Sequence, residues 1–245
     1  MFVPCGGRPE AININNVSHL FSTSSSPLSI QVPRFKYIVE GANLFITQAA
    51  RLHLESQGVI LFKDSSANKG GVTSSSLEVL AALALSDEDF TKHMCVTDQN
   101  NPPPFYKEYV EEVQRVIEEN ARLEFECIWE ENKRTGVPKS IISDQLSNNI
   151  NQMADQMEHS QFWEDKELRK IILSKSFPKV LLNALGYEQI TKRVPVAYQK
   201  AIFHSYLASR FIYKYGTTPS QFAFFEFMKQ FSNSWCNFLI VDSIP

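Results

Sequence analysis

The sequence predicts an α/β domain that continues into a mostly helical region. Two short apolar runs, Tyr37–Val39 and residues 59–62, have the β-branched and aromatic side chains of buried strands, and a turn follows each. A helical pattern over residues 47–56 lies between them, which makes the strands parallel neighbours in one sheet. Parallel strands place ligand sites at their carboxyl ends, and Asn43 and Asn68 both fall at such ends.

The elements around this unit follow from local pattern. Residues 1–3 have the apolar character of the end of a buried strand, and residues 4–9 have the Pro and Gly content of a turn. In the helix predicted over residues 47–56, Ala49, Leu52 and Ser56 share one face. Gly58 is a natural stop for that helix.

A second helix is predicted over residues 72–85, where apolar side chains wrap nearly all round, as in a helix buried on most sides. Its predicted first turn holds Thr73, Ser74, Ser75 and Ser76. Free backbone N–H groups and the helix dipole favour a bound carboxylate there, although capping by one hydroxyl explains the pattern as well. An acidic run after Ser86 and the prolines at 102–104 indicate a domain boundary.

The remainder of the chain has repeated helical patterns. Long helices are predicted over residues 105–134, 141–157 and 195–215, with shorter ones over 163–174 and 178–185. Gly136, Gly186 and Gly216 are the predicted stops of three of them. The run from Thr218 to Gln221 fits a capping box with Pro219 at the first helical position. The apolar face of the helix behind it would be Phe222, Phe225, Met228 and Phe231.

Composition excludes several classes of protein. The 245 residues carry a formal net charge of −3, which argues against a strongly basic surface for nucleic acid. No apolar run approaches the length needed to span a membrane, and residues 1–15 lack the features of a secretory signal. The four cysteines, Cys5, Cys95, Cys127 and Cys236, form no C-x-x-C pair, and the histidines are scattered, so no metal site is predicted.

Two motifs carry a family resemblance. Glu40-Gly41-Ala42-Asn43, together with Asn68-Lys69-Gly70-Gly71-Val72 and the following Ser75 and Glu78, resembles the coenzyme domain of glutamate dehydrogenases. The sequence from Val39 to Phe45 is similar to that of the large NAD-specific enzymes found in fungi, and residues 196–211 resemble the carboxyl-terminal region of those enzymes. The resemblance implies that residues 1–90 are the carboxyl-terminal part of a Rossmann-like, doubly wound NAD-binding domain, and that residues 91–245 are a helical carboxyl-terminal region.

The resemblance also implies a site and a reaction, the NAD-dependent oxidative deamination of L-glutamate to 2-oxoglutarate and ammonia. Residues expected to contact NAD are Cys5, Gly6, Gly41, Asn43 and Asn68. Residues expected to contact the substrate are Asn68, Gly70, Gly71 and Ser75, with Ser75 on the side-chain carboxylate of glutamate. By the same resemblance, the full-length protein is a homo-oligomer in the cytoplasm or the mitochondrion, without nucleic-acid or membrane partners.

This sequence departs from the family pattern at two places and lacks two of the family's features. Leu44 to Thr47 stand where many relatives have Pro and Thr, and Lys69 stands where Ala is frequent. The G-x-G-x-x-G fingerprint and the catalytic lysine have no counterpart here, so the chain is expected to be a carboxyl-terminal piece that cannot turn over glutamate alone.

Two other functions stay open at this point. One is a dehydrogenase for leucine, valine or phenylalanine, against which the Ser75 hydroxyl argues mildly. The other is a non-catalytic helical interaction or regulatory module, which the missing fingerprint favours for the chain by itself.

Overall fold

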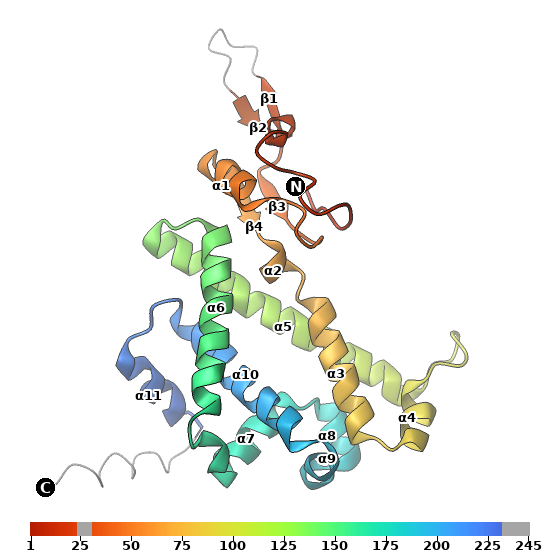
Figure 1. Ribbon diagram of the computed structural model, residues 1–245. Coiled ribbons are helices and arrows are strands. Elements are labelled where there is room, and N and C mark those ends of the chain that lie inside the picture. The colour runs from red at the N-terminus through yellow and green to blue at the C-terminus, as the bar shows by residue number, and fades with distance from the viewer. Residues whose placement is uncertain (24–30, 232–245) are drawn as a thin grey trace, which may run out of the picture. The chain divides into compact units, whose positions relative to one another are not determined.

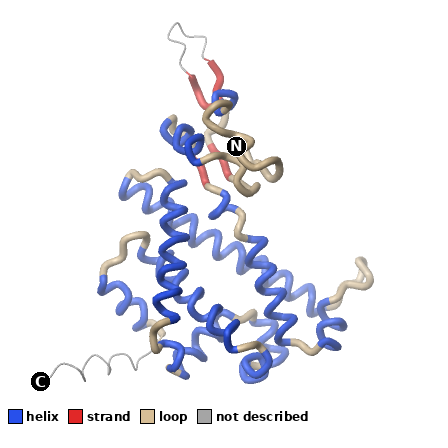
Figure 2. Tube along the Cα trace, viewed as in Figure 1, coloured by secondary structure: helices blue, strands red, loops and turns tan. Residues whose placement is uncertain are grey.

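The computed structural model describes residues 1–23 and 31–231, and these residues are mostly helical with few strands (Figures 1 and 2). They form two compact units. The first unit comprises Met1–Gly70 with Ala121–Asn148, and the second comprises Gly71–Asn120 with the chain from Asn149 onward. Cys236, one of the four cysteines considered above, lies outside the described residues.

The first unit contains the predicted parallel strands. Strand β3 (Tyr37–Val39) pairs in parallel with β4 (Ile60–Phe62), with Ile38 opposite Leu61. Phe2 adds a parallel bridge on the other side of Ile38, because the Val39 N–H donates to the Phe2 carbonyl at 3.1 Å. The strand character predicted for the first three residues is therefore confirmed at Phe2. A second, antiparallel pair joins β1 (Phe21–Thr23) to β2 (Gln31–Pro33), after a short 3-10 turn, η1 (Val17–Leu20).

Helix α1 (Gln48–Ser56) lies between the two strands in the chain, as predicted, and covers one face of the parallel pair. Its buried residues are Ala50, Arg51 and Leu54, whereas Ala49, Leu52 and Ser56 are exposed. Ala50 and Leu54 pack with Ile38 and Leu61, and Arg51 is tolerated between them because it is ion-paired. The Thr47 hydroxyl caps the helix by accepting from the Ala50 N–H at 3.4 Å.

Helix α5 (Pro104–Thr135) covers the opposite face through the part of it that lies in this unit. Because side chains alternate along a strand, Phe62 points away from the α1 side. Its ring stacks on Phe125, with centroids 4.9 Å apart, and lies 6.5 Å from Trp129. Gly136, with φ of +71°, ends α5 where predicted, and α6 (Lys139–Glu158) follows. The parallel pair therefore has a helix on each face.

Strand β4 is followed by two helices, α2 (Asp64–Ala67) and α3 (Gly70–Ala84). Helix α3 begins two residues before the predicted start at residue 72. The acidic run after Ser86 is the first turn of a helix that the pattern did not predict, α4 (Asp87–Met94). Ser86 caps it by accepting from the Asp89 N–H at 3.0 Å, and the acidic side chains suit a helix amino terminus.

The second unit is a set of packed helices. It contains η2 (Phe162–Glu164), α7 (Lys166–Ser176), α8 (Lys179–Leu185), α9 (Tyr187–Arg193), α10 (Val196–Tyr215) and α11 (Gln221–Lys229). Helix α10 packs against α7 and buries Phe203, Leu207 and Phe211. His204 on α10 is also buried. Burial lowers its pKa, and its Nε2 has no hydrogen-bond partner among the described residues, so the ring is neutral at pH 7.

Two predictions for this unit need correction. Helix α9 was not predicted, because Gly186 both ends α8 and precedes α9 without an intervening loop. The cap of α11 is Ser220, whose hydroxyl accepts from the Ala223 N–H at 3.2 Å, and not Thr218. Of the predicted apolar face, Met228 and Phe231 are buried, together with Ala223 and Phe227, whereas Phe222 is 78% exposed and Phe225 43% exposed.

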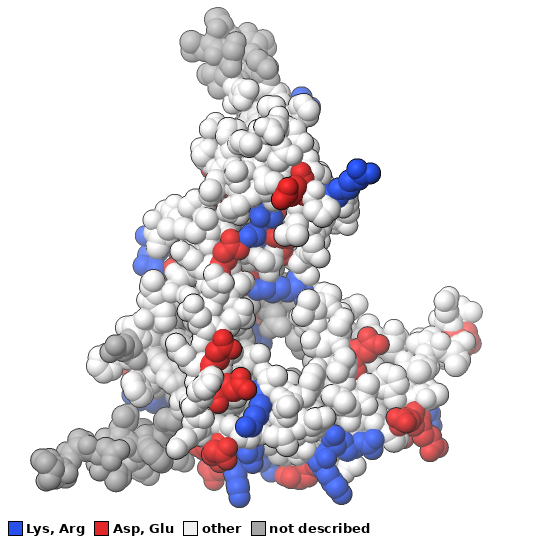
Figure 3. All heavy atoms as spheres, viewed as in Figure 1, with Lys and Arg blue, Asp and Glu red and all other residues white. Residues whose placement is uncertain are grey.

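Neither a membrane-spanning helix nor a surface of one charge sign is found in what the structure and Figure 3 show of the described residues. Among the described residues, none of the helices combines the length and the apolar character needed to cross a membrane. On the face of the molecule in Figure 3, acidic and basic side chains are interspersed among uncharged ones.

Candidate functional site

The two asparagines that follow the parallel strands meet in the first unit. Asn43 lies in the turn after β3, and Asn68 lies at the carboxyl end of α2, shortly after β4. The Asn68 Nδ2 donates to Asn43 Oδ1 and, at 3.3 Å, to the carbonyl oxygen of Gly41. Asn43 is exposed and Asn68 is half-buried, so packed side chains do not seal off the pair.

Cys5 and Gly6 lie beside this pair of turns. The Ala42 N–H donates to the Pro4 carbonyl at 2.7 Å, which ties the loop after Phe2 to the turn after β3. A Cβ at Gly41 would lie 3.0 Å from Cys5 Sγ and 3.2 Å from Pro4 O, so only glycine fits there without a shift. A Cβ at Gly6 would meet nothing within 4 Å, which leaves that backbone open. The structure thus gathers Cys5, Gly6, Gly41, Asn43 and Asn68.

The residues predicted for the substrate follow along α3. Gly70 and Gly71 are its first two residues, so their N–H groups lie at the free amino terminus of the helix. Ser75 falls in the second turn rather than the first, because the helix begins earlier than predicted. Its side chain is exposed, and no hydrogen bond of its hydroxyl is found within the described part of the chain. The chain passes from the first unit to the second after Gly70.

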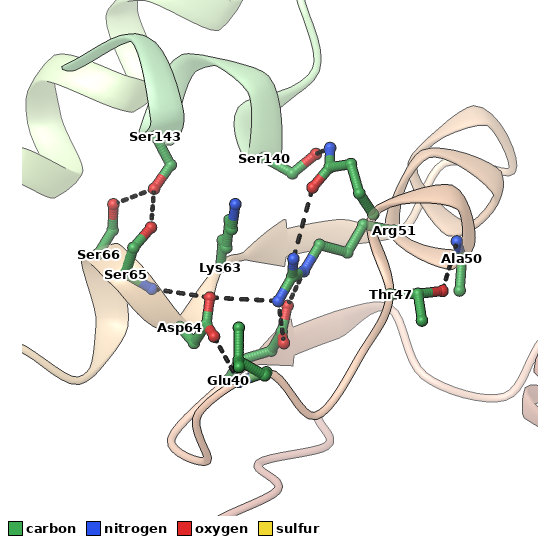
Figure 4. A network of polar contacts seen from close by, with 12 residues as sticks. Glu40, Thr47, Ala50, Arg51, Lys63, Asp64, Ser65, Ser66, Ser140 and Ser143 are labelled. Atoms are coloured by element: carbon green, nitrogen blue, oxygen red, sulfur yellow. Dashed lines mark hydrogen bonds and ion pairs between the residues drawn. The ribbon is translucent and has the colours of Figure 1, made fainter. Parts of the chain in front are cut away.

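A buried ionic network holds the two asparagine turns (Figure 4). Arg51 from α1 donates to both oxygens of Glu40, at 2.7 and 2.8 Å, and to Asp64 Oδ1 at 3.2 Å. The three residues are between 0% and 5% exposed. Although burial alone would lower it, the hydrogen bonds and charges of Glu40 and Asp64 raise the pKa of Arg51, so the guanidinium is charged.

Asp64 connects the ionic network to both turns by accepting backbone hydrogen bonds. Its Oδ2 accepts from the Leu44 N–H at 2.6 Å, next to Asn43, and its Oδ1 accepts from the Ser65 N–H at 2.9 Å, at the start of α2. Leu44 has φ of +55°, a left-handed conformation that costs energy for a residue with a side chain. One carboxylate therefore stabilises both the unusual backbone beside Asn43 and the helix that carries Asn68.

Arg51 and Asp64 were missed by reasoning from sequence. The available signal was a charged residue, Arg51, between Ala50 and Leu54 on a short helix, with Glu40 directly after an apolar strand. This signal becomes specific only when the three-dimensional pairing is known, because arginine in a protein is mostly exposed and is rarely buried unless it is paired. In the described part of the chain, no cluster of histidine, cysteine and acidic side chains has the composition of a metal site.

Comparison with known proteins identifies the chain's relatives. Residues 1–136 match the family model of glutamate/leucine/phenylalanine/valine dehydrogenase. The chain is 57% identical over 229 residues to "Glutamate dehydrogenase 2" of Dictyostelium discoideum, covering 94% of the chain and 21% of that protein. It is 51% identical to "NAD-specific glutamate dehydrogenase" of Neurospora crassa, with the same coverage of both chains.

The protein of the same name from Saccharomyces cerevisiae is 45% identical, with 93% of the chain and 21% of that protein covered. The chain thus spans about a fifth of the length of the curated relatives it matches. No solved structure matches significantly. The resemblance to the large NAD-specific enzymes is confirmed, and it extends across nearly the whole chain.

Proposed function

The chain belongs to the glutamate/leucine/phenylalanine/valine dehydrogenase family, and from this premise we propose that it forms the nicotinamide-facing part of the active site of an NAD-dependent glutamate dehydrogenase. The whole enzyme would oxidise L-glutamate to 2-oxoglutarate and ammonia. NAD, when bound, accepts the hydride, and the protein's part is to orient coenzyme and substrate.

One observation carries the proposal, the contact between Asn68, Asn43 and the Gly41 carbonyl. A side-chain amide offers a donor pair and an acceptor, which complements the carboxamide of nicotinamide and the hydroxyls of ribose. The two amides fix each other's orientation, so their remaining donor and acceptor positions are set before a ligand arrives. Gly41, Cys5 and the open backbone of Gly6 would let the coenzyme approach beside them.

The arrangement of the first unit supports the coenzyme-domain assignment. A parallel pair joined through a helix that covers one of its faces, here α1, is a feature of doubly wound dinucleotide-binding sheets, and both asparagines lie where the strands end. We propose that residues 1–90 are the last part of such a domain and that residues 91–245 are a helical region attached to it. The phosphate-binding fingerprint has no counterpart in the sequence, so these residues fit the nicotinamide end of NAD rather than its pyrophosphate.

Substrate recognition is proposed for Asn68, Gly70, Gly71 and Ser75. The N–H groups of Gly70 and Gly71 at the start of α3 suit a carboxylate oxygen, and the exposed Ser75 hydroxyl can donate to the side-chain carboxylate of glutamate. We assign no catalytic acid or base to this chain, because the family's catalytic lysine has no counterpart here.

Ser75 provides the test of this function. Replacing Ser75 by alanine is expected to weaken binding of 2-oxoglutarate in the presence of NADH by about tenfold to a hundredfold, since a hydrogen bond to a charged group is lost. Calorimetry on the 245-residue chain, and on any longer product of its gene, measures this effect.

Ser76→Ala is the matched control, because the exposed Ser76 hydroxyl donates only to its own helix, to the Val72 carbonyl at 2.9 Å. Equal effects of the two substitutions would remove Ser75 from the proposed site. Tighter binding of leucine or phenylalanine than of glutamate would favour the dehydrogenase of apolar amino acids instead.

A further inference from the structure

Lys69 lies between two residues of the proposed site, Asn68 and Gly70, yet its ammonium group is bound by a distant helix. The Lys69 Nζ is 2.7 Å from Oε1 and 2.6 Å from Oε2 of Glu124, so both carboxylate oxygens accept from it. Glu124 belongs to the part of α5 that lies in the first unit, 55 residues further along the chain. Local sequence around the motif gives no sign of this partner.

Only one partner of this ion pair is buried. The side chain of Glu124 is 2% exposed, whereas that of Lys69 is 38% exposed. A carboxylate with so little access to water is costly unless a cation pairs with it. Lys69 is therefore held toward the helix, because release of the ammonium group would take a cation away from a buried carboxylate.

Three neighbouring contacts join the same segment to α6, the helix that follows α5. The Lys63 Nζ is 2.5 Å from Asp144 Oδ1. The Ser65 hydroxyl is 3.0 Å from that of Ser143, which also contacts Ser66 (Figure 4). Asp144 and Ser143 lie in the part of α6 that belongs to the first unit. Residues 63–69 are thus held by polar contacts to α5 and α6 on one side and by the Arg51 network on the other.

We propose that Lys69 and Glu124 are positioning residues of the coenzyme site, an inference that rests on the function proposed above. Asn68 lies between the Asp64 carbonyl, which accepts from the Asn68 N–H at 3.0 Å, and Lys69, which α5 holds. Anchoring both sides fixes the backbone of Asn68 so that its amide reaches Asn43 and Gly41. Helix α5 sets the geometry of the asparagine pair through Lys69, which itself does not touch the ligand.

The test compares amide hydrogen exchange with coenzyme binding in the 245-residue chain. In Lys69→Met and in Glu124→Gln, exchange of the Asn68 amide is expected to accelerate about tenfold or more, and NADH binding is expected to weaken in parallel. The double variant should exchange no faster than either single one, because the pair acts as a unit. Lys69→Arg, which keeps the charge, should stay within about twofold of the parent.

Lys133→Met is the matched control, since Lys133 on the same helix forms an exposed pair with Glu130 at 2.9 Å and should leave both measurements unchanged. Unchanged Asn68 exchange in Lys69→Met together with weaker NADH binding would overturn the proposal, because Lys69 would then act on the ligand directly. If Lys69→Met does not fold, Glu124→Gln and the double variant decide, since both remove the charge of the buried carboxylate. If the parent does not bind NADH, the proposed function fails while the exchange measurement still decides the positioning role.

Discussion

Replacing Arg51 by methionine is expected to lower the free energy of unfolding of the first unit by about 3 to 5 kcal/mol. The substitution keeps the unbranched apolar stem of the side chain but removes the guanidinium, so Glu40, 0% exposed, and Asp64, 5% exposed, lose their shared cation. It also weakens the support that Asp64 gives to the Leu44 N–H and to the start of α2.

Native-state hydrogen exchange measures this loss within the first unit. The Ile60 N–H donates to the Lys36 carbonyl at 2.9 Å and the Glu40 N–H to the Phe62 carbonyl at 3.0 Å, so both amides report opening of the parallel pair. The control is Lys133→Met, whose side chain and partner are 58% and 69% exposed, with an expected change below about 1 kcal/mol. A loss in Arg51→Met no larger than in this control would contradict a structural role for the network.

Replacing Asn68 by aspartate is expected to weaken NADH binding by about tenfold to a hundredfold. The shape of the side chain is retained, but the donor that reaches Asn43 Oδ1 and the Gly41 carbonyl becomes a charged acceptor. Two acceptor oxygens would then face a carboxylate, so the amide pair would separate and lose its fixed orientation. Fluorescence titration of NADH into the purified chain gives the change in affinity.

Asn183→Asp makes the same chemical change at an exposed position on α8 and controls for the added charge. Its affinity for NADH should equal that of the parent. Full NADH affinity in Asn68→Asp would mean that the asparagine pair is not the place where the coenzyme binds.

The sequence predicted those parts of the fold that short-range patterns encode. The strands at Tyr37–Val39 and Ile60–Phe62, the helix between them and the stops at Gly136, Gly186 and Gly216 all depend on side chains a few residues apart. The meeting of the two asparagine turns also followed, because the ends of adjacent parallel strands lie at one edge of a sheet.

The parts that sequence reasoning missed depend on partners far away in the chain. The buried side of α1 is set by Arg51, whose charge is tolerated only because Glu40 and Asp64 surround it. The role of Lys69 depends on Glu124, which appears in the sequence as one of many acidic residues on a long solvated helix. In α11, the cap is Ser220 and not Thr218, and Phe222 and Phe225 are exposed although Met228 and Phe231 are buried.

The most direct test of the central claim is a titration of the isotopically labelled 245-residue chain with NADH, followed by NMR of its side-chain and backbone amides. If NADH binds at the two asparagines, the side-chain amide signals of Asn43 and Asn68 will shift and saturate together with the backbone signals of Gly6 and Gly41. Shifts confined to other residues, or their absence at millimolar NADH, would contradict a coenzyme site at the two asparagines.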